Sequence, residues 1–553
     1  MSPVKVATLI VSLLICMTVI GAPQVLAQGF VPEELLVHYN PRTPRVVVDE
    51  VNRDRGAAVI RTFPRAPNLR QIRTPLNVHL DGAIGYNRPN ENMDYVDKAL
   101  NASGASRFSF LPVFQSDASE FLGLSLVNTS AVVDDVAVTW TNSDGSIART
   151  GHLPLAPGAQ RALLVKEILN MPEDPTEGWI QIESPQASVL GYLTSGKDAI
   201  LDGTEPASQL ATTIFFAHVG VNTGFAELEH TDTFVTLINP GSVVASARAQ
   251  LIGLDGLIVD NLAVSIPARA SRTVLVSESF RDVLPANSYG GRTFKGYMKV
   301  SSDVALAGWL RIDTPLSRRL LRGRAVEEIV AARIAMVSHF ASGGASLYHS
   351  VLNLINAGDA AVVLEISAQD NRGGKIGESI RLTLGPGQGI REDVLNLFRV
   401  VVAAVYPPQM ITGYIRIRAA DGSMFRSVGD IDITTAGNAA SMLYPITAVP
   451  SSDWIMPFVI NGEDYFTGYA IANPNELLTV QTDVTIEVLD RDGSVAGSPL
   501  KLSLSPSARF VGMVKELLQS GYLRIHANGP VILLGSIGTC SGNTLAPLPA
   551  IPR

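Results

Sequence analysis

Apolar runs that end in an asparagine recur four times along the chain. The runs read LSLVN, VTLIN, VLNLIN and GYAIAN, and they end at Asn128, Asn239, Asn356 and Asn473. Their spacing of 111, 117 and 117 residues is too long for the units of a solenoid and is typical of whole β domains in tandem. The pattern therefore predicts an array of four β domains.

Each copy continues with the same order of signals. About eight residues after the asparagine, apolar and polar residues alternate, as in Val136, Val138 and Trp140, which predicts a half-buried strand. A turn follows sixteen residues after the asparagine, and three residues later in the fourth copy, where one insertion explains the shift. The four turns are Asp144-Gly145, Asp255-Gly256, Arg372-Gly373 and Asp492-Gly493.

Further along, each copy has a strand that ends at a proline, a short helix-like stretch, a variable loop and a glycine-aromatic pair that opens the last strand. The pairs are Gly178-Trp179, Gly296-Tyr297, Gly413-Tyr414 and Gly521-Tyr522. We expect these aromatic rings to anchor the cores, and a row of rings that stacks on sugars is the alternative. Short strands with regular turns are typical of Ig-like β-sandwiches. The predicted repeats span 103–212, 213–333, 334–448 and 449–553.

Independent domains would leave few contacts at these boundaries. Limited proteolysis is then expected to cut near Ser103, Glu205, Arg322 and Pro450. The variable loops at 170–177, 285–295 and 399–412 are the expected binding positions, because loops on a rigid scaffold tolerate variation.

The first 27 residues have the pattern of an export signal. Lys5 precedes an apolar stretch, and Val25-Leu26-Ala27 fits a cleavage site. We expect a secreted, periplasmic or cell-surface protein, without a membrane span after cleavage. Only Cys540 would then remain, so no internal disulfide is expected.

A different unit is predicted at 28–102. Strands at 33–39, 57–63, 69–74 and 93–99 and helices at 44–55 and 78–87 give the order βαββαβ, which indicates a small α+β domain of ferredoxin-like fold. Here the segments VPEELLVHY, VIRTF and RPNENMDYV, with Gly56 after the first helix, resemble the pro-domain of subtilisin-type proteases, also called inhibitor I9-like. The resemblance covers about 29–100 only.

The resemblance implies a domain that packs on a protease and lays its tail in the active-site cleft. That possible protease-contacting tail is Asp97, Lys98, Ala99, Leu100, Asn101, Ala102 and Ser103. The protease domain itself is missing, because the Asp, His and Ser motifs of that family do not occur in this sequence. The chain is therefore not a self-contained subtilase.

Composition narrows the function classes. With 46% hydrophobic residues and 17% charged residues, the chain can build large cores, and its net charge of −8 argues against nucleic-acid binding. The one basic cluster, RRLLRGR at 318–324, is interpreted as a solvated linker, with an anionic contact or a processing site as alternatives.

Candidate chemistry is sparse. Gly538-Thr539-Cys540-Ser541-Gly542 is interpreted as a turn and not as a nucleophile site. The eight histidines form no zinc motif, and His218 and His339, at the same place in two copies, are interpreted as structural, with weak metal binding or pH sensing as the alternative. The aspartates of the turns are interpreted as caps rather than calcium ligands. We expect no enzyme activity, no cofactor and no metal.

Two functions therefore remain. The first is a secreted, non-enzymatic structural or binding array that contacts an envelope or extracellular component. The alternative is a protease-associated protein whose N-terminal domain binds or inhibits a subtilisin-type protease in trans. A glycan-active enzyme is disfavoured, because no paired carboxylates stand out.

Overall fold

The computed structural model describes residues 106–552 apart from 114–119, 198–199, 224–229, 289, 345, 402–407, 436–439, 448, 476–480, 516–517 and 540–544. Before residue 106 it describes only six short strands. The chain divides into two compact units, Met1–Ala102 and Ser103–Arg553.

The strands of the first unit form two antiparallel sheets, with the orders β1-β2-β4-β3 and β5-β6. Their bounds are β1 Ser12–Leu13, β2 Glu34–His38, β3 Ala58–Phe63, β4 Ala66–Arg73, β5 Ala83–Gly85 and β6 Val96–Lys98. Strand β5 lies where a helix was predicted at 78–87, so that expectation is wrong for these three residues. The predicted helix at 44–55 lies outside the described residues, and no ferredoxin-like domain is seen.

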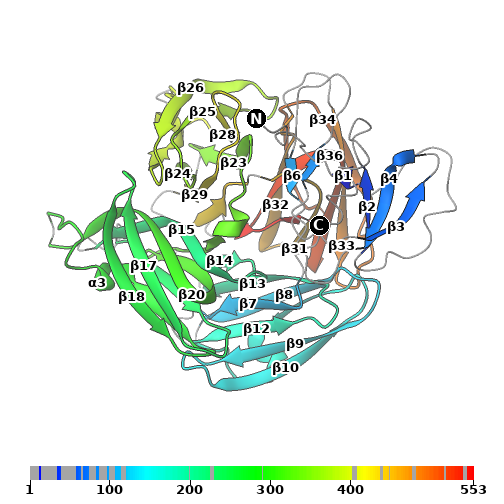
Figure 1. Ribbon diagram of the computed structural model, residues 1–553, viewed down its shortest axis with the longest axis horizontal. Coiled ribbons are helices and arrows are strands. Elements are labelled where there is room, and N and C mark those ends of the chain that lie inside the picture. The colour runs from blue at the N-terminus through cyan, green and yellow to red at the C-terminus, as the bar shows by residue number, and fades with distance from the viewer. Residues whose placement is uncertain are drawn as a thin grey trace, which may run out of the picture. The chain divides into compact units, whose positions relative to one another are not determined.

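The second unit is mostly β, as predicted, and its antiparallel sheets pair into sandwich-like units that we number 1 to 4 along the chain (Figure 1). Sandwich 1 combines the sheet β10-β9-β12-β7 with the sheet β11-β8-β13-β14. Its strands are β7 Phe108–Pro112, β8 Phe121–Asn128, β9 Asp134–Thr141, β10 Ile147–Leu155, β11 Gln160–Leu164, β12 Trp179–Glu183, β13 Val189–Lys197 and β14 Ile200–Thr204.

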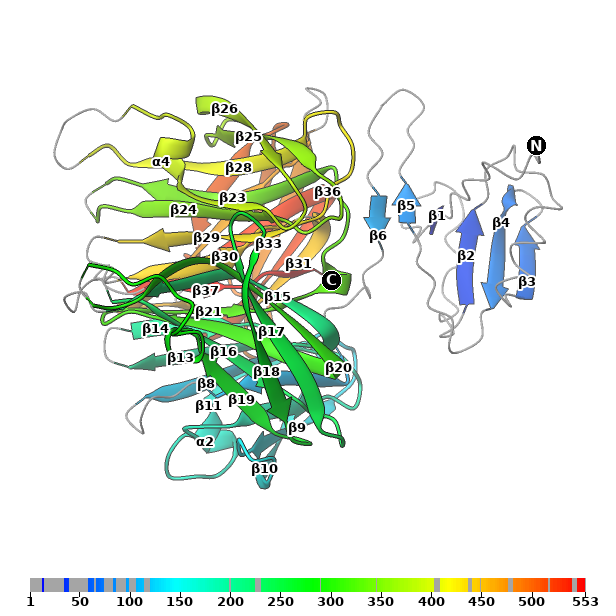
Figure 2. The same cartoon turned by 60° about the vertical axis from the view of Figure 1, so that its left-hand side comes forward.

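Sandwich 3 has the same arrangement, with the sheets β26-β25-β28-β23 and β27-β24-β29-β30 (Figure 2). Its strands are β23 Ile334–Ser342, β24 His349–Asn356, β25 Val362–Gln369, β26 Lys375–Leu384, β27 Gly389–Asp393, β28 Ile411–Ala419, β29 Ser427–Thr434 and β30 Ser441–Pro445.

In sandwiches 2 and 4 one long strand runs from the first sheet into the second. Strand β20, Thr293–Asp313, joins the path β18-β17-β20-β15-β22 to β16, β19 and β21. The remaining bounds in sandwich 2 are β15 Ala211–Asn222, β16 Asp232–Ile238, β17 Ala245–Gly253, β18 Ile258–Ile266, β19 Ser271–Leu275, β21 Arg318–Arg322 and β22 Arg324–Ala325.

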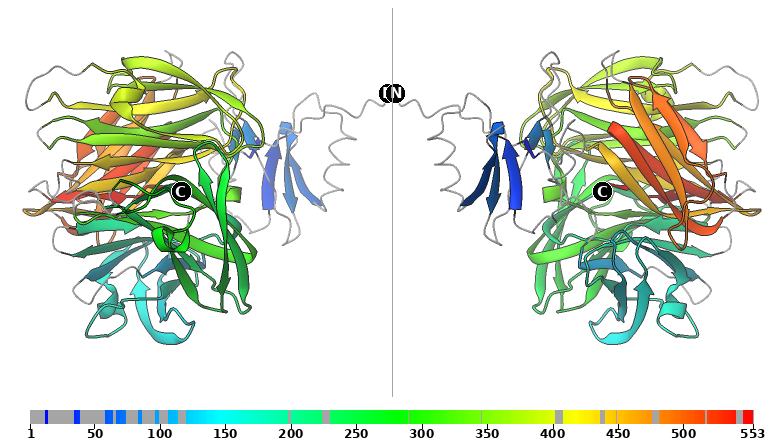
Figure 3. Two further views of the ribbon diagram at one scale, coloured as in Figure 1. Left: turned by 90° about the vertical axis from the view of Figure 1, so that its left-hand side faces the viewer. Right: turned by 90° about the vertical axis from the view of Figure 1, so that its right-hand side faces the viewer.

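Strand β36, Leu518–Thr539, has this role in sandwich 4, whose orange-to-red strands are seen in the right panel of Figure 3. The other bounds are β31 Ser451–Asn461, β32 Tyr465–Ala472, β33 Thr482–Asp490, β34 Leu500–Leu504, β35 Arg509–Met513, β37 Leu545–Leu548 and β38 Ile551–Pro552.

Three of the predicted helix-like stretches are short helices. They are α2 Val165–Ile168, α3 Val276–Ser279 and α4 Val394–Leu397, and a single 3-10 turn, η1, covers Val326–Glu328. Each sandwich also has its own apolar core, because its strands point alternate side chains inward. In sandwich 1, for example, Val136 and Val138 are fully buried.

The recurring asparagine ties two neighbouring turns to the end of its strand. The Asn128 side-chain amide donates to the carbonyl oxygens of Val132, Leu155 and Ala156 at 2.7, 3.0 and 3.2 Å. Asn239 and Asn356 make the same three kinds of bond, and Asn473 makes two of them. All four side chains are buried, so the motif satisfies backbone carbonyls that a hydrophobic residue would leave unpaired.

One short strand of each sandwich brings the four sandwiches together. These strands are β14, β21, β30 and β37, which pair with β13, β20, β29 and β36. Strand β14 contacts β21, β21 contacts β30, β30 contacts β37, and β37 contacts β14. The four sandwiches therefore follow one another in a closed ring, visible as the cyan, green, yellow-green and orange groups of strands in Figure 1.

Candidate functional site

The ring has four contacts, which we call 1–2, 2–3, 3–4 and 4–1 after the sandwiches that meet. The aromatic residue of each glycine-aromatic pair donates a hydrogen bond to a backbone carbonyl in the next sandwich. Trp179 bonds Arg269 at 2.9 Å, Tyr297 bonds Gly387 at 3.0 Å, Tyr414 bonds Ser507, and Tyr522 bonds Gly158 at 2.9 Å. The fourth bond returns to sandwich 1, so the same aromatic latch is used all the way round.

These four rings are buried, as expected of core anchors, but the place where they are buried differs from the expectation. Each belongs to a small apolar cluster that contains residues of two sandwiches. At contact 4–1, for instance, Tyr522 and Ile455 pack with Val127 and Leu190. The aromatic residues therefore join neighbouring sandwiches and do not fill the cores of their own.

The four predicted turns, three of them Asp-Gly and one Arg-Gly, also dock on the next sandwich. The backbone N–H groups of Ser271, Gly389, Arg509 and Gln160 donate to the preceding turns at 3.1, 2.8, 3.0 and 2.9 Å. Gly493 shows how close the backbones lie, because a Cβ atom there would meet the carbonyl oxygen of Gly158 at 2.4 Å. Its φ of +87° also favours glycine.

The aspartates of these turns cap the backbone, as interpreted from the sequence. Asp144 Oδ1 accepts from the Ser146 N–H at 2.8 Å, and Asp492 Oδ1 accepts from the Ser494 N–H at 2.8 Å. No group of three or more His, Cys, Asp or Glu positioned to hold a metal ion occurs among the residues that the structure describes. Calcium at these turns stays the untested alternative.

The interpretation of the basic cluster at 318–324 as a solvated linker is wrong. Residues Arg318–Arg322 form strand β21, and every one of them is buried. Arg318 makes two bonds to Glu120 of sandwich 1, at 2.8 and 3.1 Å, whereas Arg319 pairs with Asp432 of sandwich 3. A solvated linker would have left these guanidinium groups in water; here each is paired with a carboxylate from another part of the ring.

Arg322, near which limited proteolysis is expected from the sequence, is also buried and paired. It is 9% exposed and pairs with Glu205 at 3.2 Å and with Glu328 at 2.9 Å. Burial lowers the pKa of Arg322, but the two carboxylates outweigh it and raise the pKa above its usual value. Cleavage near Glu205 or Arg322 would require this network to open, so these boundaries are not exposed linkers.

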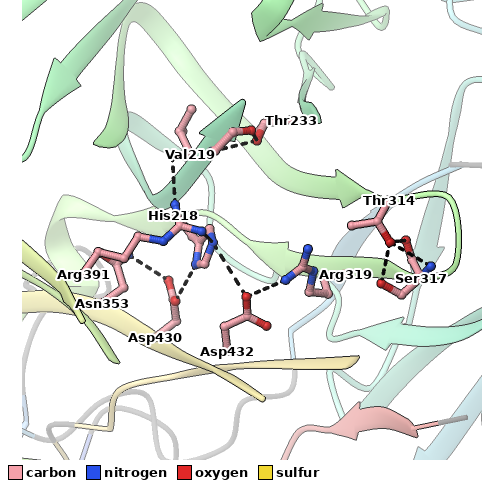
Figure 4. Close-up of polar contacts among 11 residues, drawn as sticks. His218, Val219, Thr233, Thr314, Ser317, Arg319, Asn353, Arg391, Asp430 and Asp432 are labelled. Atoms are coloured by element: carbon pink, nitrogen blue, oxygen red, sulfur yellow. Dashed lines mark hydrogen bonds and ion pairs between the residues drawn. The ribbon is translucent and has the colours of Figure 1, made fainter. Parts of the chain in front are cut away.

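A polar cluster fills contact 2–3, and its charges come from both sandwiches (Figure 4). His218 Nδ1 lies 2.9 Å from Asp430 Oδ1, and His218 Nε2 accepts from the Arg391 guanidinium. Asp432 Oδ2 lies 4.0 Å from His218 Nε2 and also forms an ion pair with the Arg319 guanidinium. Asn353 donates to the Ala217 carbonyl and to Asp430.

Burial sets the protonation states in this cluster. It lowers the pKa of His218 well below the usual range, and Arg391 lowers it further. Burial also raises the pKa of Asp430 to about 7, against the opposing effect of the Asn353 hydrogen bond and of Arg391. Both effects on His218 favour its neutral imidazole, which contacts Asp430 and Arg391.

His339, which has the position in sandwich 3 that His218 has in sandwich 2, lies at contact 3–4. Its Nδ1 accepts a hydrogen bond of 2.9 Å from Arg509 of sandwich 4. Arg509 is 3% exposed and also bonds Asn371, Thr412 and the carbonyl of Gly413. One guanidinium thus connects several segments of the neighbouring sandwich.

The remaining predicted site residues form no site among the residues that the structure describes. Asp97 and Lys98 lie in strand β6, whereas Ala99–Ser103, Cys540 and Ser541 lie outside the described residues. Among the residues described, no helix has the length and apolar character needed to cross a membrane.

Comparisons with known proteins give no family. No family model matches the chain, and no curated protein matches it. Among solved structures, it is similar to the Streptomyces avermitilis α-L-rhamnosidase complexed with L-rhamnose, with 10% identity over 78% of this chain and a TM-score of 0.13. It spans 56% of the length of that enzyme. The T13 particle of IBDV is similar at 9% identity and a TM-score of 0.11, over 76% of this chain and 77% of that chain. Neither likeness carries an argument.

Proposed function

We propose that this chain is a secreted, non-enzymatic scaffold: a rigid ring of four Ig-like sandwiches that presents its variable loops to an envelope or extracellular component. The observation that carries this proposal is the aromatic latch, which recurs at all four contacts and returns from sandwich 4 to sandwich 1. A closed ring holds the strands on which the loops begin and end, and preorganised binding surfaces lose less conformational entropy on binding.

The most distinctive side chains of the repeats support the same proposal. The recurring asparagines bond their own turns, the aromatic rings bond the next sandwich, and the arginines of β21 bond carboxylates around the ring. These polar groups hold the scaffold together and are occupied by partners within the chain. Binding is then assigned to loops, which connect the rigid elements and tolerate variation.

The loop that follows α4 offers the clearest contact point. Val401 in this loop is 94% exposed, far more than most apolar side chains of the described chain. The corresponding loops after α2 and α3 occupy the same place in sandwiches 1 and 2, because each leads into the strand that carries the aromatic latch. An apolar residue held in water by a rigid scaffold is a suitable anchor for a partner.

Retention of the tagged full-length chain on envelope and extracellular fractions of the producing cell tests the proposal. Val401→Ser should reduce retention several-fold, because it removes an apolar contact. Val363→Ser, on strand β25 with 45% exposure, is the matched control and should leave retention unchanged. Equal retention of all three proteins would remove the loop from the proposal, and hydrolysis of peptide, ester or glycoside substrates by the purified chain would overturn the non-enzymatic scaffold.

A further inference from the structure

The two histidines at equivalent positions, the buried His218 and the half-buried His339, face different charges. His218 at contact 2–3 lies near two carboxylates, Asp430 and Asp432, as well as two guanidinium groups, Arg391 and Arg319. The pKa of Asp430 is raised to about 7 whereas that of His218 is lowered well below 6.5, so Asp430 is protonated first as the pH falls. Asp432 is then the carboxylate that offsets the charge of a proton added to His218.

His339 at contact 3–4 has no such compensation. Burial lowers the pKa of Arg509 to about 10, so its guanidinium is still charged at neutral pH. The Nδ1 atom of His339 accepts from this guanidinium, so Nε2 carries the hydrogen of the neutral ring. Within the part of the chain that the structure describes, no carboxylate lies within ion-pair distance of His339 or Arg509. The Asp370 carboxylate raises the pKa of Arg509 without forming an ion pair with it. Arg416, which bonds the Ser507 hydroxyl, adds a second cation to this contact.

We propose that contact 3–4 is an acid-sensitive joint of the ring: a proton on His339 replaces its acceptor with a donor that faces Arg509 and weakens the contact between sandwiches 3 and 4. Two donors then point at each other across a buried contact, and Arg509 loses one of the acceptors that hold it. The remaining partners of Arg509, such as Asn371 and Thr412, are neutral and cannot offset the added charge.

The direction of the pH effect follows from the pKa of His339. Burial and then Arg509 lower this pKa from 6.5 to about 3 in the folded chain. A lowered histidine pKa means that the folded state binds fewer protons than the open state below about pH 6.5. The stability of the contact is therefore complete above that pH and is lost as the pH falls towards 3, with the closing equilibrium weakening about tenfold per pH unit.

Hydrogen exchange of the full-length chain at pH 7.5, 6.0 and 5.0 tests this proposal, and His339→Asn is the informative variant. The Asn side-chain oxygen takes the place of Nδ1 as an acceptor and does not titrate. Comparing both proteins at the same pH removes the intrinsic effect of pH on exchange. We expect strand β35 and strand β23 to lose protection in the wild type relative to the variant by about tenfold between pH 6.0 and 5.0.

His152→Asn, which changes a histidine that is 63% exposed, is the control and should follow the wild type. Arg509→Gln gives a second route if His339→Asn does not fold, because it removes the cation and should also abolish the acid-specific loss. Parallel pH profiles for the wild type and either variant would overturn the proposal.

Discussion

Strands β21 and β37 take the same place in sandwiches 2 and 4, yet their sequences have little in common. Strand β21 reads RRLLR and sends guanidinium groups to carboxylates of sandwiches 1, 2 and 3. Strand β37 reads LAPL, is buried, and accepts a bond of 2.6 Å from Tyr192 at the carbonyl of Pro547. A place at the centre of the ring therefore requires burial and does not require charge.

The difference separates two kinds of interaction in one ring. The aromatic latch and the docked turn recur at every contact, so they are interactions that all four contacts share. Buried ion pairs occur at strand β21. They make association with a sandwich that lacks the paired carboxylates unfavourable, since an unpaired buried charge is costly. Charge then specifies the partners of sandwich 2, whereas shape and backbone bonds hold contact 4–1.

The largest expected effect comes from removing a charge on β21. Arg319→Leu leaves Asp432 buried beside a hydrophobic side chain, which should lower the free energy of unfolding by about 3–5 kcal/mol. Leu545→Val in β37 is the matched change and should cost about 1 kcal/mol, because it removes one methylene. Urea unfolding of the full-length chain measures both.

The double variant Arg319→Leu with Asp432→Leu sharpens this test. Replacing both partners removes the unpaired charge, so most of the loss should be recovered. If the double variant is as unstable as Arg319→Leu alone, the cost comes from packing at β21 and the contrast with β37 is not one of charge.

A smaller effect is expected at the docked turn of contact 4–1. Gly493→Ala places a Cβ atom against the Gly158 carbonyl oxygen and also forces alanine to a φ of +87°. We expect a loss of about 3 kcal/mol, from left-handed strain and overpacking together. Gly422→Ala isolates the strain, because its φ is +73° and nothing lies within 4 Å of its Cβ position.

Gly422→Ala should cost about 1–2 kcal/mol in the same unfolding experiment. Equal losses at the two glycines would mean that the close approach between sandwiches 4 and 1 contributes nothing, and that the turn of contact 4–1 is tolerant of a side chain.

The local elements could be predicted from the sequence, and their partners could not. Alternation placed Val136 and Val138 in a buried strand, and the Asp-Gly turns have the predicted caps. These signals depend on residues close together in the chain. By contrast, Arg319 meets Asp432 across 113 residues, and Tyr522 meets Gly158 across 364.

The basic cluster shows why this distance matters. Without knowledge of its partners, a run of arginines is best interpreted as solvated, because an unpaired buried charge is unfavourable. The glycine-aromatic pair and the turn gave sequence signals for the ring contacts, since both recur in all four copies. They indicated a shared role, but a repeated position alone does not distinguish a core from a contact between repeats.

The smallest expected effect tests whether the latch is equivalent at all contacts. Tyr522→Phe and Tyr297→Phe each remove one hydroxyl and leave a half-buried carbonyl without this hydrogen bond, so each should cost about 1 kcal/mol. Contacts 4–1 and 2–3 differ in charge and in covalent connection, because sandwiches 2 and 3 are consecutive whereas sandwich 1 is joined to sandwich 4 only through the others. If the latch acts alone, the two losses agree, because the bond that each hydroxyl makes is the same. A clearly larger loss for Tyr522→Phe in urea unfolding would contradict this equivalence and make the aromatic latch of contact 4–1 the interaction on which ring closure depends.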